Sequence, residues 1–216
     1  MIKKSIQKIY LALIFILLYA PIVTLMVLSF NESRTRAKWG GFTLKWYQEL
    51  FKNEQIMSAF YTTLLIAFLA AAAATVIGTA ASIAIQGMKQ RWRTMYMGLT
   101  NIPMMNAEIV MGVSLMLLFI ALRMTLGFGT ILIAHITFNI PYVILSVSPK
   151  LRQTSRHTYE AALDLGASPL KAFFKVVFPD IVPGVLSGFM LAFTMSLDDF
   201  VITHFTKGSL IETLST

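Results

Sequence analysis

Three carboxylates lie inside long apolar stretches of this 216-residue chain. Glu108 interrupts one stretch near the middle of the chain, and Asp198 and Asp199 fall inside the last one. An ionised acid at the centre of a membrane helix costs about 2.5–3.5 kcal/mol, and these stretches contain no Lys or Arg to compensate. We therefore expect the acids to be protonated, to be paired with another subunit, or to line a wet path used by cations. Acids within a membrane are functional by default, which favours the path.

Two aromatic residues, Tyr19 and Trp46, are candidates to complement these acids on a substrate pathway. Ammonium groups bind over the faces of aromatic rings, although an aromatic side chain at a membrane surface needs no such role. His135 and Asn139 lie one turn apart, and we expect them to form hydrogen bonds between helices rather than to bind substrate or metal. No metal site and no catalytic residue is predicted. The absence of cysteine excludes disulfides, thiolate metal sites and cysteine nucleophiles.

The elements that carry these residues are apolar stretches long enough to cross a membrane, which takes about 20 residues. Only 13% of the residues are charged, whereas a soluble domain carries about 25%. The net charge of +8 comes from basic residues grouped between the apolar stretches, which argues against nucleic-acid binding. The sequence predicts one all-α domain over residues 1–216, a polytopic transmembrane helical bundle with five spans at about 9–30, 59–85, 94–122, 126–149 and 181–206.

One face of the second predicted span carries small side chains every four residues, namely Ala70, Ala74, Gly78 and Ser82. Such a face lets another helix approach closely in lipid. Chance spacing in an alanine-rich stretch is the alternative, and both interpretations concern packing rather than chemistry.

The segment between the fourth and fifth predicted spans, about residues 150–180, is basic and predicts two short helices joined by a turn. Gly166 suits the left-handed position that ends the first helix. Ser168 and Pro169 are a favourable start for the second, as N-cap and first helical residue. Pro179 is expected to end it. One interpretation is an amphipathic segment lying on the membrane surface.

A spaced motif gives this segment a more specific interpretation. It reads Glu-Ala-Ala at 160–162, glycine at 166, and Val-x-Phe-Pro at 176–179. The motif resembles the Glu-Ala-Ala loop of binding-protein-dependent ABC importer permeases, and the chain is identified as a member of that family, with its MetI-like fold. There the loop is a coupling helix that docks onto a nucleotide-binding subunit. The resemblance implies that the ATPase contact is made by Glu160, Ala161, Ala162 and Gly166.

Further segments resemble the spermidine/putrescine permeases, specifically the second of two paired permeases. They lie at residues 19–21, 29–31, 41–47, 135–138 and 196–200. The resemblance implies a path for polyamines. Members of this family normally have a sixth span after these five, which we expect to be missing from this sequence.

The resemblance also implies the partners: an ATP-binding subunit dimer, a second homologous permease, and an extracellular or periplasmic substrate-binding protein. The chain contains no Gly-x4-Gly-Lys-Ser/Thr phosphate loop, so ATP and Mg²⁺ are expected on the partner ATPase and the chain itself is not expected to be an enzyme. Alternatives are the same architecture with another cargo, such as iron, thiamine or another small solute, or a membrane scaffold without transport activity. A scaffold would not co-purify with an ATPase.

The distribution of basic residues predicts the orientation in a bacterial inner membrane. Eleven Lys and Arg residues lie in the segments that include the amino terminus, residues 89–93 and residues 150–175, against six in the opposing segments. Under the positive-inside rule the first set is cytoplasmic.

The orientation is testable by single-cysteine labelling, because the chain contains no cysteine. A cysteine at position 46 or 216 should react with an impermeant maleimide added outside, whereas one near the amino terminus or at position 160 should react only after lysis. Labelling of position 160 from outside would reverse the topology.

Overall fold

The computed structural model describes residues 2–33, 35, 38–209 and 211–216, and every regular element in these ranges is a helix. The helices are α1 (Ile2–Leu28), α2 (Lys45–Lys52), α3 (Glu54–Gly87), α4 (Gln90–Met105), α5 (Glu108–Ala121), α6 (Phe128–Gln153), α7 (Arg156–Asp164), α8 (Pro169–Ala172), the π-helical η1 (Phe173–Val177), α9 (Phe178–Asp198) and α10 (Val201–Thr206). Four helical stretches within the described residues are long and apolar enough to cross a membrane, or five if the bent pair α4–α5 counts as one span. The predicted all-α membrane fold is confirmed.

The chain divides into two compact units, Met1–Met57 and Ser58–Thr216. In the first unit, Asn31 organises the loop that follows α1. Its side-chain amide donates to Lys38 O at 2.8 Å and accepts from Gly40 N at 2.7 Å. Its backbone also pairs with Phe42 in an isolated antiparallel bridge. The buried amide thus satisfies backbone groups of a loop that has no regular secondary structure.

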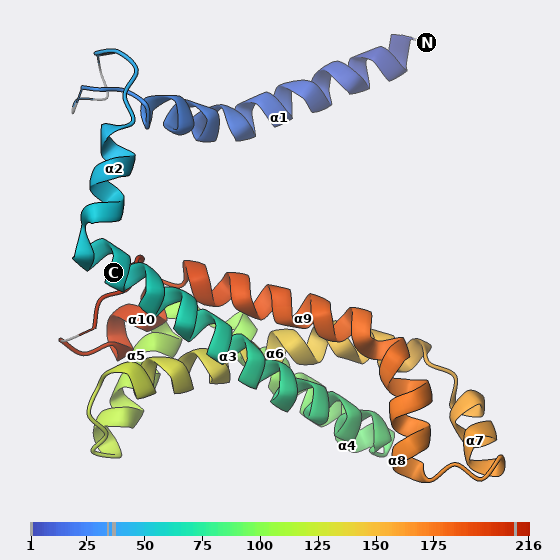
Figure 1. Ribbon diagram of the computed structural model, residues 1–216. Coiled ribbons are helices and arrows are strands. Elements are labelled where there is room, and N and C mark those ends of the chain that lie inside the picture. Colours follow the sequence, from blue (N-terminus) through green and yellow to red (C-terminus); the bar gives the residue numbers. More distant parts are fainter. Residues whose placement is uncertain (1, 34, 36–37, 210) are drawn as a thin grey trace. The chain divides into compact units, whose positions relative to one another are not determined.

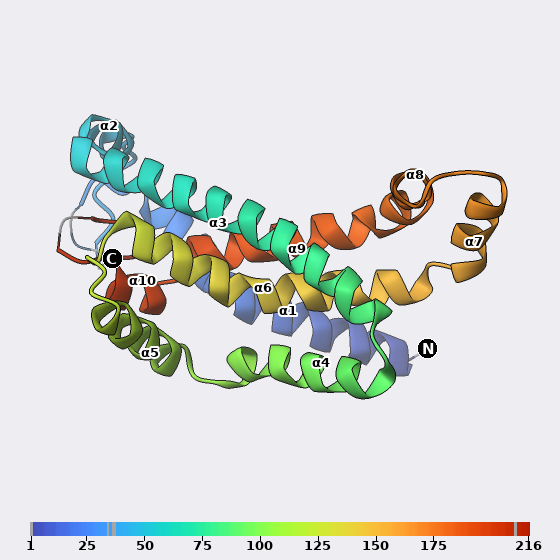
Figure 2. The same ribbon diagram turned by 90° about the horizontal axis from the view of Figure 1, so that it is seen from below.

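The second unit is built on three long helices: α6 and α9 run side by side, and α3 crosses them (Figures 1 and 2). The predicted small face of α3 is buried in this bundle, and a Cβ added at Gly78 would lie 2.8 Å from Val143 Cβ. On α9, a Cβ at Gly188 would lie 3.3 Å from Val143 Cα. Glycine is therefore needed where α3 and α9 each approach α6, and the close helix approach predicted for the small face is confirmed.

The continuous helix expected over residues 94–122 is instead two helices, α4 and α5, bent by 101° at the break. Asn106 and Ala107 between them are extended, with ψ of 148° and 137°. Pro103 lies in the last turn of α4 and removes one of its backbone hydrogen bonds, which weakens the helix just before it ends at Met105. Glu108, expected near the middle of a span, is the first residue of α5.

The last predicted span, residues 181–206, differs from the observed helix at both ends. The prediction that Pro179 ends a short helix is wrong. Instead, α8, η1 and α9 form one candidate span over Pro169–Asp198. The Phe178 N–H bonds to Phe173 O, five residues back, and this wider turn precedes a proline that has no N–H to place. At the other end the helix stops at Asp198, and the extended Asp199 leads into α10.

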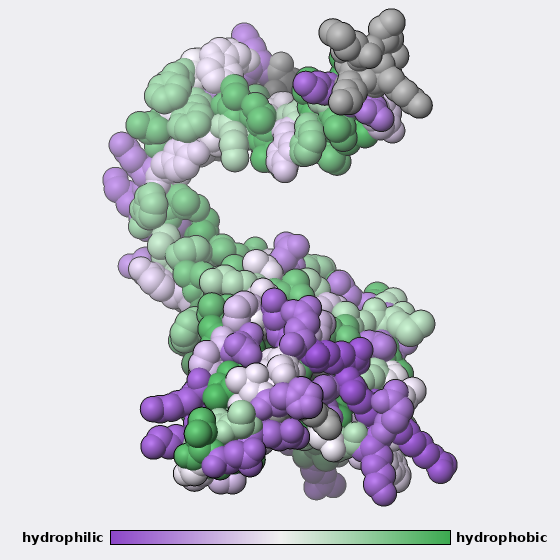
Figure 3. Space-filling view, turned by 90° about the vertical axis from the view of Figure 1, so that its right-hand side faces the viewer, coloured by the Kyte–Doolittle hydropathy of each residue, from purple (hydrophilic) through white to green (hydrophobic). Residues whose placement is uncertain are grey.

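Different helices form the two ends of the second unit. Helices α5 and α10 lie at one end of the bundle, and α7 and α8 lie at the other (Figures 1 and 2). Figure 3 looks onto the end with α7 and α8, where hydrophilic residues gather.

Candidate functional site

The three acids singled out in the sequence come together where α5, α9 and α10 meet. Glu108 begins α5, Asp198 is the last residue of α9, and Asp199 follows it. They line a pocket of about 290 Å³ together with Phe138, Thr194 and Met195. Among the described residues, no basic one lines this pocket, so its walls favour a cation.

Close helix packing brings Glu108 to this place. One turn after Glu108, Gly112 of α5 lies against α10, and a Cβ at Gly112 would lie 3.0 Å from the Phe205 ring and 3.4 Å from Val201 O. Leu115 and Phe119 of α5 also pack with Phe138 and Ile202 in one buried cluster. The start of α5 is therefore held beside the end of α9.

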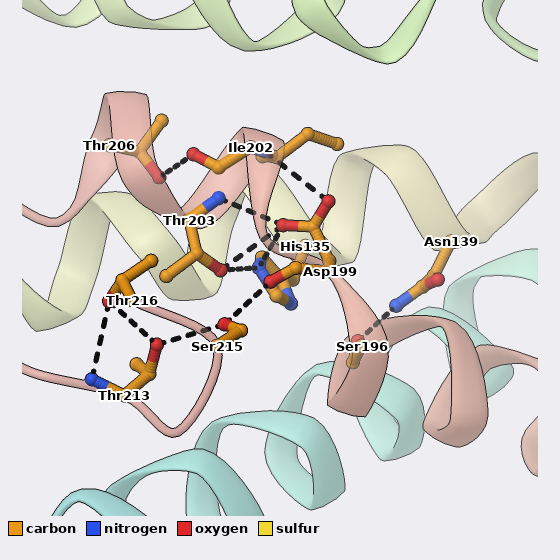
Figure 4. A network of polar contacts seen from close by, with 10 residues as sticks. All are labelled: His135, Asn139, Ser196, Asp199, Ile202, Thr203, Thr206, Thr213, Ser215 and Thr216. Carbon is orange, nitrogen blue, oxygen red and sulfur yellow. Dashed lines mark hydrogen bonds and ion pairs between the residues drawn. The ribbon is translucent and has the colours of Figure 1, made fainter. Parts of the chain in front are cut away.

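The two neighbouring aspartates have different surroundings. Asp199 is only 9% exposed, and its carboxylate accepts hydrogen bonds from the N–H groups of Ile202 and Thr203 at 3.3 and 2.8 Å and from the Thr203 hydroxyl at 3.1 Å. His135 Nε2 lies 3.3 Å from the same carboxylate (Figure 4). Asp199 therefore caps the start of α10, with every near donor already directed at it.

Glu108 and Asp198, by contrast, are exposed. Within the described ranges, neither side chain forms a hydrogen bond or an ion pair. These two carboxylates are therefore free to bind a ligand, whereas Asp199 supports the backbone beside them.

The histidine and asparagine of α6 join that helix to the segment that carries the aspartates. His135 Nε2 lies 2.9 Å from the Thr203 hydroxyl, and the Asn139 amide donates to Ser196 Oγ at 2.7 Å (Figure 4). Hydrogen bonding between helices, predicted for both residues, is confirmed. In the described residues, no group of three or more metal-ligating side chains is found.

The sequence did not indicate that the segment 211–216 joins this network. The Ser215 hydroxyl donates to Asp199 O at 2.9 Å, and Leu214 N donates to Thr63 Oγ1 on α3 at 2.9 Å. Serine and threonine in an irregular segment carry no signal for such distant partners. The contacts tie the backbone of Asp199 to a third part of the chain.

Tyr19 and Trp46, the candidate pathway aromatics, belong to the first unit. Tyr19 is exposed on α1 and stacks on Phe15, with the ring centroids 6.1 Å apart. The Trp46 indole N–H donates to Asn31 O at 2.9 Å, which fixes the ring, and the Lys45 ammonium lies 5.8 Å from its centroid. The Trp46 ring face thus already has a cation beside it.

The loop at the other end of the second unit has the predicted helix–turn–helix form. Gly166 has φ of +82°, its N–H bonds to Leu163 O at 2.9 Å, and Ala167 N bonds to Ala162 O at 3.1 Å. This pair of bonds is a Schellman motif, so the predicted left-handed end of the first helix is confirmed. Ser168 is the N-cap residue before Pro169, but its hydroxyl makes no capping bond.

The tip of this loop is apolar and exposed. Leu165 and Leu170 on either side of the turn are 89% and 73% exposed, while Glu160 faces a groove of about 550 Å³ that Phe173 and Val177 also line. Sequence reasoning chose Glu160, Ala161, Ala162 and Gly166 and missed the two leucines, whose position beside the glycine turn is the signal that marks them. Exposed apolar side chains on a polar end typify a protein-binding surface.

Apolar helices of spanning length, an acid-lined pocket and an exposed loop together define a polytopic membrane transport protein. The family model described as "binding-protein-dependent transport system inner membrane component" matches residues 74–214. This chain belongs to that family of inner-membrane transport permeases. The family provides the membrane component of ABC importers, which act with ATPase and substrate-binding subunits.

Several relatives resemble nearly the whole chain. The spermidine/putrescine transport system permease protein PotC of Haemophilus influenzae is 38% identical over 205 residues, which cover 95% of this chain and 80% of the relative. The putrescine transport system permease protein PotI of Escherichia coli is 41% identical over 201 residues, 90% of this chain and 72% of the relative. PotC of Escherichia coli is 37% identical over 214 residues, 99% of this chain and 81% of the relative.

The contrast between the aspartates gives a matched test of stability. Asp199→Asn places an amide where the carboxylate now accepts several hydrogen bonds, and leaving buried donors poorly paired costs about 1–3 kcal/mol. Asp198→Asn changes an exposed side chain, so its effect should stay within about 0.5 kcal/mol. Thermal unfolding of the purified protein in detergent should therefore show a lower midpoint for Asp199→Asn alone. Equal midpoints would contradict the capping role.

Proposed function

We propose that this chain is the transmembrane subunit of an ATP-driven importer for polyamines, and that Glu108 and Asp198 line the path. The observation that carries the proposal is the pocket in which these two unpartnered carboxylates lie together without a basic residue. The cargo is supported by the names of the relatives, which are permeases for spermidine or putrescine. Two or more ammonium groups on one flexible chain suit a pocket lined by two carboxylates.

In this proposal the acids replace water around the cargo. An ammonium group that leaves solvent loses its hydration, and carboxylates restore it through charge-assisted hydrogen bonds. The Phe138 ring in the pocket wall adds an aromatic face for the same cation. Asp199 keeps the end of α9 in place beside the pocket. In the first unit, Tyr19 has an exposed ring that suits a cation, whereas the Trp46 ring already has Lys45 beside it.

Coupling to ATP is proposed to occur at the other end of the second unit. Glu160, Ala161, Ala162 and Gly166, with Leu165 and Leu170, bind a separate ATPase that holds ATP and Mg²⁺. The exposed apolar tip supports this assignment, because a loop of this kind needs a protein partner rather than solvent. The complete importer then contains an ATP-binding subunit dimer, a second homologous permease and a substrate-binding protein outside. The amino terminus and the loop lie in the cytoplasm.

Charge removal in the pocket tests the cargo. Glu108→Gln and Asp198→Asn preserve side-chain volume but remove a charge-assisted partner, so each should lower uptake of labelled spermidine or putrescine roughly tenfold or more. Asp180→Asn, which removes the same charge from the other end of α9, is the control and should transport normally. Wild-type uptake by both pocket variants at normal expression would exclude the acids from the path.

Two substitutions at Gly166 test the coupling loop. Asparagine tolerates the left-handed conformation, so Gly166→Asn should keep the turn and much of the activity. Gly166→Arg is strained at φ of +82° and adds a bulky charge to the docking surface, so it should insert normally but abolish uptake and co-purification with the ATPase. Normal uptake by the arginine variant would refute the assignment.

A further inference from the structure

A second polar pocket lies between the start of α4 and the end of α6, and neither the proposed cargo path nor the coupling loop uses it. Its volume is about 430 Å³. Arg93 and Arg152, from segments 59 residues apart in the chain, both line it. Gln90, Thr94 and Asn101 contribute further polar groups to its wall. The pocket therefore brings two guanidinium groups and several neutral hydrogen-bonding groups to one place.

The charges in this pocket are unbalanced. Among the described residues, no acidic one lines it, and neither the Arg93 nor the Arg152 side chain forms an ion pair or a hydrogen bond there. Arg93 is also half-buried, so water screens it less than a fully exposed side chain. Two guanidinium groups without a counter-charge favour an anion, and their planar forks match the oxygens of a phosphate.

The surroundings of the pocket are those of a membrane surface. Arg93 lies in the first turn of α4 and Arg152 in the last turn of α6, a helix apolar enough to span. Beside them, Trp92 and Tyr96 are exposed and their ring centroids lie 6.5 Å apart. Tryptophan and tyrosine concentrate at the level of the lipid headgroups. The pocket thus opens at the depth at which lipid phosphates lie.

We propose that Arg93 and Arg152 bind the phosphate group of an anionic membrane lipid. Basic pockets between membrane helices on the cytoplasmic side suit such headgroups. Helix α4 has no buried residue of its own, so its attachment to α6 is thin. A phosphate held by both arginines would add a link between these helices. The site is independent of the cargo and of the coupling loop.

The test compares lipid retention by two double variants of the full chain. Each variant is reconstituted with its partner subunits into vesicles of phosphatidylglycerol and phosphatidylcholine and then extracted. Arg93→Gln with Arg152→Gln removes both guanidinium groups from the pocket. Lys89→Gln with Arg91→Gln removes the same charge from the same segment, but these exposed residues do not line the pocket. Native mass spectrometry then measures the phosphatidylglycerol that stays bound. The first variant should retain roughly tenfold less than wild type, and the second should match wild type.

Two further measurements make the result decisive. Arg93→Lys with Arg152→Lys keeps the charge but loses the planar fork, so its lipid retention should be intermediate. Inorganic phosphate in excess should not displace the lipid, since it lacks the acyl chains that hold the headgroup in place. Equal lipid loss from the two glutamine variants, or no loss from either, would overturn the proposal. Displacement of the lipid by inorganic phosphate would assign the pocket to a soluble anion and overturn the lipid as its ligand.

Discussion

Burial of the Asp199 carboxylate among apolar helices requires donors close to it, and that requirement shapes the end of the second unit. Two backbone N–H groups, the Thr203 hydroxyl and His135 supply them. To present those N–H groups the chain must leave α9 and begin a new helix, so the long helix ends beside the pocket. The break also leaves Asp198 exposed in the pocket next to Glu108. A buried acid with a structural role thus creates the place where another acid can meet a ligand.

Helices α6 and α9 connect this end with the coupling loop through contacts that leave little room for movement. Near the acids, the Asn139 amide reaches Ser196. Towards the loop, a Cβ on Gly184 would lie 2.9 Å from Lys150 Cγ and 3.0 Å from Ser146 O. The two helices approach this closely because Gly184 has no side chain, and their contact is tightly packed there. In the proposed importer, these contacts would link a displacement at α7 and α8 to the acid pocket.

The features that the sequence predicted correctly depend on short-range patterns. Gly166 followed by Ala, Ser and Pro specifies a helix end and a helix start, and the spacing of His135 and Asn139 places both on one face. The features that it missed depend on distant residues. The gathering of Glu108 with the aspartates requires Gly112 to pack on α10, and no local pattern gives the break after Pro103 its angle. Pro179 misled for the same reason, because its normal preference for ending a helix was overridden by the wide turn before it.

That wide turn, η1, also sets the directions in which Ala172 and Gly184 point around the helix axis. Twelve residues separate Ala172 from Gly184, and in a regular α-helix they would point about 120° apart. One extra residue in the π turn reduces this angle to about 20°, so both small residues face the same way and both are buried. Loss of a single residue from η1 would leave an unbroken helix whose loop and span face different directions.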